Sequence, residues 1–67
     1  MKPQMITCGA YALHVVGPEA NWQTELTEIR FKIPAGSPSE AAWTEATRVG
    51  RKKWKRFLEV QEVWGHI

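Results

Sequence analysis

The residues with the clearest chemistry in this chain are basic, and they are concentrated in one short segment. Six of the nine Lys and Arg residues lie between positions 48 and 56, where there is no acid. These are Arg48, Arg51, Lys52, Lys53, Lys55 and Arg56. The rest of the chain holds three cations and seven glutamates, a net charge of −4. Concentrated cations attract polyanions, because phosphates release condensed counterions when they are neutralised. The segment therefore predicts an anionic partner.

A helix would present most of these cations on one side. At roughly 100° per residue, five of them fall within about 140° of helix circumference. The five are Arg48, Arg51, Lys52, Lys55 and Arg56. Nucleic acid is the expected partner of this face, and an acidic protein surface is the other choice. The same pattern also fits a solvated helix face whose cations complement the helix dipole.

Four tryptophans, Trp22, Trp43, Trp54 and Trp64, are many for 67 residues. Trp43 and Trp54 are three helical turns apart and would share one apolar face, so we expect them in the core. Trp54 also lies among the cations, where it could stack on a base. Trp22 and Trp64 are predicted at an interface with a partner or a second subunit, because tryptophan is enriched at the centres of interfaces.

No set of residues predicts catalysis or a metal site. Cys8 and His14 would lie ~20 Å apart along one strand, so the thiol is expected to be buried and inert. One cysteine with His14 and His66 cannot complete a tetrahedral zinc site without acidic ligands. The chain has no aspartate for a Ser-His-Asp triad. We therefore expect a non-enzymatic protein without catalytic residues, metal or cofactor.

Two segments in the first half of the chain have the pattern of strands. Residues 5–16 are apolar on both alternating sets, which is typical of a strand covered on both faces. Residues 27–33 alternate between apolar and charged side chains, as in a half-buried strand. Gly17 and Pro18 interrupt the chain between them. Antiparallel pairing of the two segments is predicted.

A helix is predicted to start at residue 38. Ser37 would cap it by accepting from the amide of Glu40, and the Glu40 side chain would reach back to the amide of Ser37. Pro38 suits the first helical position, because its missing N–H is not needed there. The expected buried arc of this helix is Trp43, Ala46, Gly50, Trp54 and Phe57. Gly50 would allow close packing on a strand.

The C-terminal segment leaves two arrangements open. A short third strand near 58–64 gives an α+β fold of order β-β-α-β, a small antiparallel sheet with one amphipathic helix packed on it. The second arrangement is β-β-α, with one long helix that continues to about residue 62. We favour the third strand, and we treat residues 1–67 as a single small domain.

Length and composition predict self-association. A 67-residue chain buries only ~60% of its unfolded surface, and small domains commonly add a disulfide, a metal or a second subunit. A lone cysteine cannot form an internal disulfide, so we expect a homo-oligomer. No stretch approaches the ~20 apolar residues of a membrane helix, and the N-terminus lacks the apolar run of a signal peptide. We therefore expect no membrane partner and a cytoplasmic location, which the unpaired cysteine also fits.

These observations together predict a binding protein that engages nucleic acid through a basic helix face. The first alternative is a protein–protein interaction module, an inhibitor or accessory factor of a larger protein. A variant of this is an oligomer that encloses a nucleotide-like ligand between subunits, with tryptophan stacking on the base and arginine on the phosphate. The predicted partner-binding residues are Arg48, Arg51, Lys52, Lys55, Arg56, Trp22 and Trp64.

Overall fold

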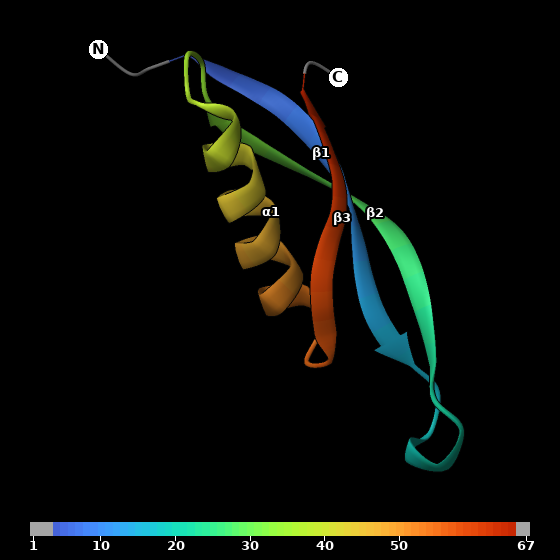
Figure 1. The fold of residues 1–67 in the computed structure, drawn as a ribbon. Coiled ribbons are helices and arrows are strands. Elements are labelled where there is room, and N and C mark those ends of the chain that lie inside the picture. The colour runs from blue at the N-terminus through green and yellow to red at the C-terminus, as the bar shows by residue number, and fades with distance from the viewer. Residues whose placement is uncertain (1–3, 66–67) are drawn as a thin grey trace.

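The computed structural model describes residues 4–65 and has the order strand, strand, helix, strand (Figure 1). The elements are β1 (Met5–Val16), a short 3-10 turn (Glu19–Asn21), β2 (Gln23–Pro34), α1 (Ser39–Lys53) and β3 (Phe57–Gly65). This confirms the α+β fold and the β-β-α-β order. The C-terminal segment is a strand, so the long-helix arrangement is wrong.

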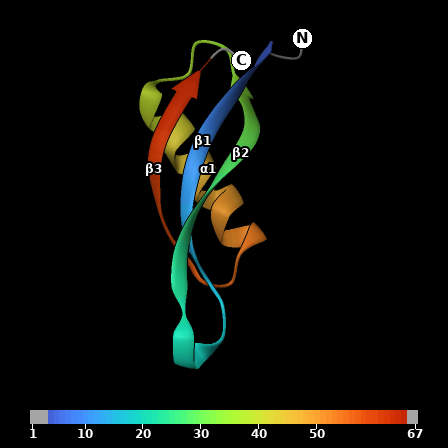
Figure 2. The same ribbon diagram turned by 90° about the vertical axis from the view of Figure 1, so that its right-hand side faces the viewer.

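The three strands form one antiparallel sheet in the order β2-β1-β3. Pairing between β1 and β2 runs without interruption from Met5↔Pro34 to Val16↔Gln23. The ladder between β1 and β3 is shorter and contains two register shifts. The hairpin of β1 and β2 therefore continues as an arm beyond β3 and α1, as both views show (Figures 1 and 2).

The core lies between α1 and one face of the sheet. Its buried apolar residues are Cys8, Ala10 and Ala12 of β1, Ile29, Phe31 and Ile33 of β2, and Ala42 and Ala46 of α1. Small side chains at the contact let the helix approach the sheet closely. Gly50 is part of this contact, because an added Cβ would lie 2.5 Å from the Phe57 ring. The expected close packing at Gly50 is present.

The buried stripe of α1 differs from the prediction. It consists of Ala42, Ala46 and Gly50, spaced four residues apart, while Trp43 is 43% exposed. The sheet packs on the side of the helix with the smallest residues, since that side allows the closest approach. The helix also ends at Lys53, and Trp54 has the extended backbone with which the chain turns toward β3.

The predicted capping box does not form. The Ser37 hydroxyl donates to the carbonyl oxygen of Pro34 at 2.6 Å, within the turn that follows β2. No side-chain hydrogen bond caps the start of the helix, where Pro38 occupies the N-cap position. The helix begins at Ser39, and the Pro38 carbonyl oxygen accepts from the amide of Ala41 at 2.9 Å. The Ser37 hydroxyl therefore stabilises the turn before the helix, as serine hydroxyls often do.

The second face of the sheet has no helix over it in the part of the chain described (Figure 1). Tyr11 and Trp64 contact each other on this open face, with ring centroids 5.0 Å apart. Met5 and Leu26 also belong to this face by strand register and are exposed. The open face therefore combines an aromatic pair with exposed apolar side chains.

Candidate nucleic-acid interface

The basic residues gather at the C-terminal end of α1 and in the connection to β3. We call this surface the basic turn; it comprises Arg51, Lys52, Lys53, Lys55 and Arg56. All five residues are exposed. Within residues 4–65, the ion pairs that form involve Arg30 and Arg48, and none involves the basic turn. Lys55 and Arg56 were expected on the helix face, but they lie beyond its end.

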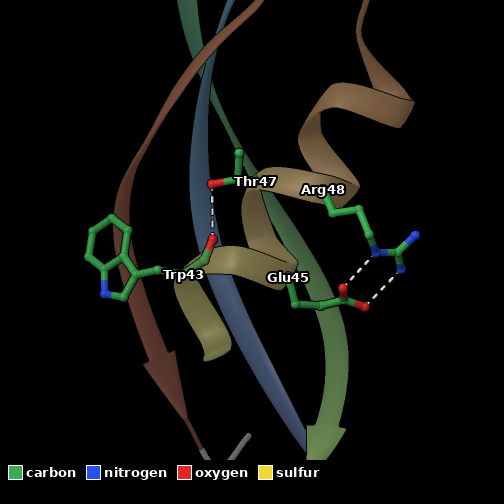
Figure 3. A network of polar contacts seen from close by, with 4 residues as sticks. All are labelled: Trp43, Glu45, Thr47 and Arg48. Carbon is green, nitrogen blue, oxygen red and sulfur yellow. Dashed lines mark hydrogen bonds and ion pairs between the residues drawn. The ribbon is translucent and has the colours of Figure 1, made fainter. Parts of the chain in front are cut away.

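Arg48 is the one predicted cation of the segment that has an acidic partner. Its Nε and Nη2 atoms donate to the two carboxylate oxygens of Glu45 at 2.6 and 2.8 Å (Figure 3). Through these hydrogen bonds, Arg48 holds the pKa of Glu45 below its usual value. The same contact raises the pKa of Arg48. Glu45 therefore neutralises Arg48, whereas the five cations of the basic turn have no acidic partner among residues 4–65.

Trp54 anchors the basic turn to the sheet. Its ring stacks on the imidazole of His14, with centroids 4.2 Å apart and planes inclined by 8°. His14 is 4% exposed, and its Nε2 atom hydrogen-bonds to Thr27 Oγ1 at 2.7 Å. Lys53 Nζ lies 5.3 Å from the centre of the Trp54 ring, within range of a cation–π contact. The Trp54 ring is thus engaged within the chain, which argues against the predicted stacking on a base.

His14 also has a buried nitrogen without a partner. Its Nδ1 atom makes no hydrogen bond with the described residues. The stack with Trp54 therefore covers a polar atom rather than a purely apolar surface. The His14 imidazole is hydrogen-bonded to Thr27 and stacked against Trp54, so these two contacts define its position between β1 and the basic turn.

The exposed tryptophan nearest to the cations along α1 is Trp43, which sequence reasoning placed in the core. With Thr44, Thr47, Arg48 and Arg51 it lines an open depression of about 470 Å³ on the outer side of α1. Its indole points away from the Glu45–Arg48 pair (Figure 3).

The orientation of Trp43 follows from the choice of buried stripe. Thr47 Oγ1 donates to the Trp43 carbonyl oxygen at 2.9 Å, so this hydroxyl bonds back to the helix. The sequence does contain a pattern that indicates this arrangement. Ala42, Ala46 and Gly50 are small residues spaced four apart, so they share one side of the helix, and burial of that side leaves Trp43 exposed to solvent.

The other two predicted tryptophans lie at opposite ends of the sheet. Trp22 is 54% exposed at the tip of the hairpin arm, one residue before β2 begins. This is the end of the sheet where Val15 hydrogen-bonds to Arg56 at 3.0 Å. Trp64 lies seven residues beyond the start of β3, about 23 Å along an extended strand. The basic turn therefore shares its end of the sheet with Trp22, and Trp64 is remote from it.

The cysteine and histidines singled out in the sequence do not form a metal site among the described residues. Within residues 4–65, no group of three or more His, Cys or Glu side chains could hold a metal ion. Cys8 is a buried free thiol, and His66 lies outside the described residues. Among residues 4–65, no helix is both long enough and apolar enough to cross a membrane.

Comparisons with protein-family models, with curated proteins and with solved structures gave no match to this chain.

Proposed function

We propose that this chain binds nucleic acid through the basic turn. The observation that carries the proposal is the set of five exposed cations between residues 51 and 56, without an acidic partner among residues 4–65. Surface cations are commonly interleaved with acids, which cancel their field. An uncompensated cluster attracts phosphates and gains affinity from counterion release.

The attachment of the basic turn to the sheet supports the same function. The stack of Trp54 on His14 fixes the backbone between Lys53 and Lys55, so their Cα positions are set before a ligand arrives. A site whose positions are already ordered loses less conformational entropy on binding.

Trp43 favours a single-stranded ligand. Its exposed indole and the Arg51 side chain line the same depression on α1. Proteins that bind single strands combine a cationic track for the backbone with aromatic rings on which bases stack. In this arrangement phosphates lie along the basic turn, and one unpaired base stacks on Trp43.

The basic turn is tested by removing three of its charges. We expect Arg51→Gln/Lys52→Gln/Lys55→Gln to lose most of the affinity for a single-stranded oligonucleotide at low salt, because three phosphate contacts are removed together. Lys32→Gln is the control, since it removes an exposed cation from β2. Fluorescence anisotropy of a labelled oligonucleotide gives the affinities. Equal affinities of the triple variant and the control would contradict the proposal.

The stacking role of Trp43 is tested separately. Trp43→Ala should weaken binding of single strands by about 1–3 kcal/mol, the usual contribution of one stacked base. Binding of a duplex should change much less, because its bases are already stacked on each other. A matched titration with a single strand and a duplex of the same sequence distinguishes the two. An equal loss for both ligands would show that Trp43 does not stack on bases.

The open sheet face favours a second candidate, a protein partner. Tyr11 and Leu26 are exposed apolar side chains on this face, in neighbouring strands and offset by two residues in the register. Exposed apolar side chains that lie together often mark protein–protein contacts. Binding of this kind depends on apolar anchors and tolerates salt, so Leu26→Ser should abolish it while the triple variant leaves it intact.

A further inference from the structure

The outer edge of β2 is a long, regular and unpaired strand edge in the described part of the chain. β2 spans 12 residues, and it pairs with β1 on one side only. Its ladder with β1 contains no bulge. Unpaired edges of this kind are templates for pairing with another strand.

The backbone groups that point outward can be identified from the ladder. The Ala35 amide donates to the Gln4 carbonyl oxygen at 2.6 Å, so these two residues form a hydrogen-bonded pair. Hydrogen-bonded pairs alternate along an antiparallel ladder. The odd-numbered residues of β2 therefore bond to β1, and the even-numbered residues direct their N–H and C=O groups outward. The outward amides belong to Thr24, Leu26, Glu28, Arg30 and Lys32.

The charges on this edge are arranged symmetrically about Ile29. Glu28 and Arg30 flank it, and both side chains are exposed and contact each other at 3.0 Å within the chain. If a second β2 pairs antiparallel about Ile29, Glu28 of each copy lies opposite Arg30 of the other. Because Ile29 is close to the middle of β2, this register uses almost the whole strand.

We propose that β2 pairs with β2 of a second copy of this chain, antiparallel and centred on Ile29. The outward amides and carbonyls of Leu26, Glu28, Arg30 and Lys32 then hydrogen-bond across the twofold axis. The two sheets become one continuous sheet with a helix of each copy on the same face. Leu26 is covered by the aliphatic part of Lys32 from the second copy.

Three of the neighbouring registers are disfavoured by charge. Centring on Glu28 or on Arg30 places two like charges on the axis. Centring on Phe31 sets Arg30 opposite Lys32, again with like charges across the strands. Like charges directly opposite each other destabilise a strand pair, whereas opposite charges stabilise it. The edge is therefore complementary to itself in the Ile29 register, which favours a second copy over an unrelated strand.

Two single charge reversals test this register. Glu28→Arg places arginine opposite arginine in both halves of the pair, and Arg30→Glu places glutamate opposite glutamate. Each variant alone should associate about tenfold more weakly than the wild type, because two attractive pairs become repulsive. An equimolar mixture should form a heterodimer of wild-type strength, since both cross-strand pairs are then opposite in charge. Sedimentation velocity with one fluorescently labelled variant measures this directly.

The mixture separates cross-strand pairing from effects within the chain. Both single variants lose the contact between residues 28 and 30, so recovery in the mixture cannot come from restoring it. The double variant Glu28→Arg/Arg30→Glu should associate as the wild type does, and circular dichroism verifies that each variant folds. The proposal is overturned if the wild type stays at 7.7 kDa at high micromolar concentration. It is also overturned if mixing the single variants restores nothing.

Discussion

Glu45 forms an ion pair with Arg48, one of the cations predicted to bind nucleic acid. The two side chains share two hydrogen bonds, and their charges cancel next to the depression that Trp43 and Arg51 line. The pair lies on the side of α1 away from the Trp43 indole (Figure 3). An acid placed here limits the basic surface to the end of the helix. Removing that acid should extend the surface by one arginine.

We predict that Glu45→Gln raises affinity for single-stranded nucleic acid. The freed guanidinium can contact one more phosphate, so the salt dependence should steepen by up to about 0.7 in the log–log slope. Glu40→Gln is the matched control, because it removes a negative charge from the same helix without releasing an arginine. If the two variants bind alike, net charge rather than the freed Arg48 explains the change.

For single residues, the sequence predicted which cations lie close together, but it did not predict that Trp43 is exposed. The predicted site residues Arg51, Lys52, Lys55 and Arg56 do gather on one surface. Trp43 and Trp54 were both expected in the core. Trp54 does pack against it, but Trp43 is exposed, because the small residues of α1 rather than the aromatic ones face the sheet. Which stripe of a helix is buried depends on how closely the sheet can approach, and this is decided by packing.

The elements themselves were largely predictable. Both long strands, the helix and the third strand follow from alternation, helical spacing and punctuation by glycine and proline. The ends of the helix were less predictable. The Ser37 hydroxyl donates to the carbonyl oxygen of Pro34 in the preceding turn, and the N-cap position falls on Pro38. The end at Lys53 follows from the stack of Trp54 on His14, a contact between residues 40 positions apart that no local pattern reveals.

Gly50 provides a prediction at the scale of packed elements. In an exposed helix, Gly→Ala stabilises by about 1 kcal/mol through helix propensity. Here the new methyl group would lie 2.5 Å from the Phe57 ring, so the ring must move. We expect Gly50→Ala to lower the free energy of unfolding by about 1–3 kcal/mol, as overpacking does.

Thermal or chemical denaturation measures this change. Phe57→Leu, which shortens the side chain facing Gly50, is the matched background for the same substitution. The cost of Gly50→Ala should be smaller in that background, because neighbouring side chains that clash are not additive. A stabilising Gly50→Ala in the wild type would show that α1 and β3 do not pack as closely as described.

The whole molecule separates its surfaces by chemistry. One end of the helix carries the basic turn, the open sheet face carries the exposed aromatic and apolar residues, and the outer edge of β2 carries paired charges. The molecule is also elongated, 51 by 18 by 16 Å, because the hairpin arm extends past the helix. Because the surfaces are separate, the two proposals, pairing through β2 and nucleic-acid binding at the basic turn, are compatible.

The salt dependence of nucleic-acid binding tests the central proposal most directly. A plot of log affinity against log salt for a single-stranded oligonucleotide should be linear. Its slope should correspond to about 0.7 for each phosphate neutralised, and three to five contacts are expected from a surface of this size. Arg51→Gln/Lys52→Gln/Lys55→Gln should reduce the slope by about 2, while Lys32→Gln should leave it nearly unchanged. A wild-type protein that binds no oligonucleotide at low salt, or a slope that the triple variant does not change, would contradict binding through the basic turn.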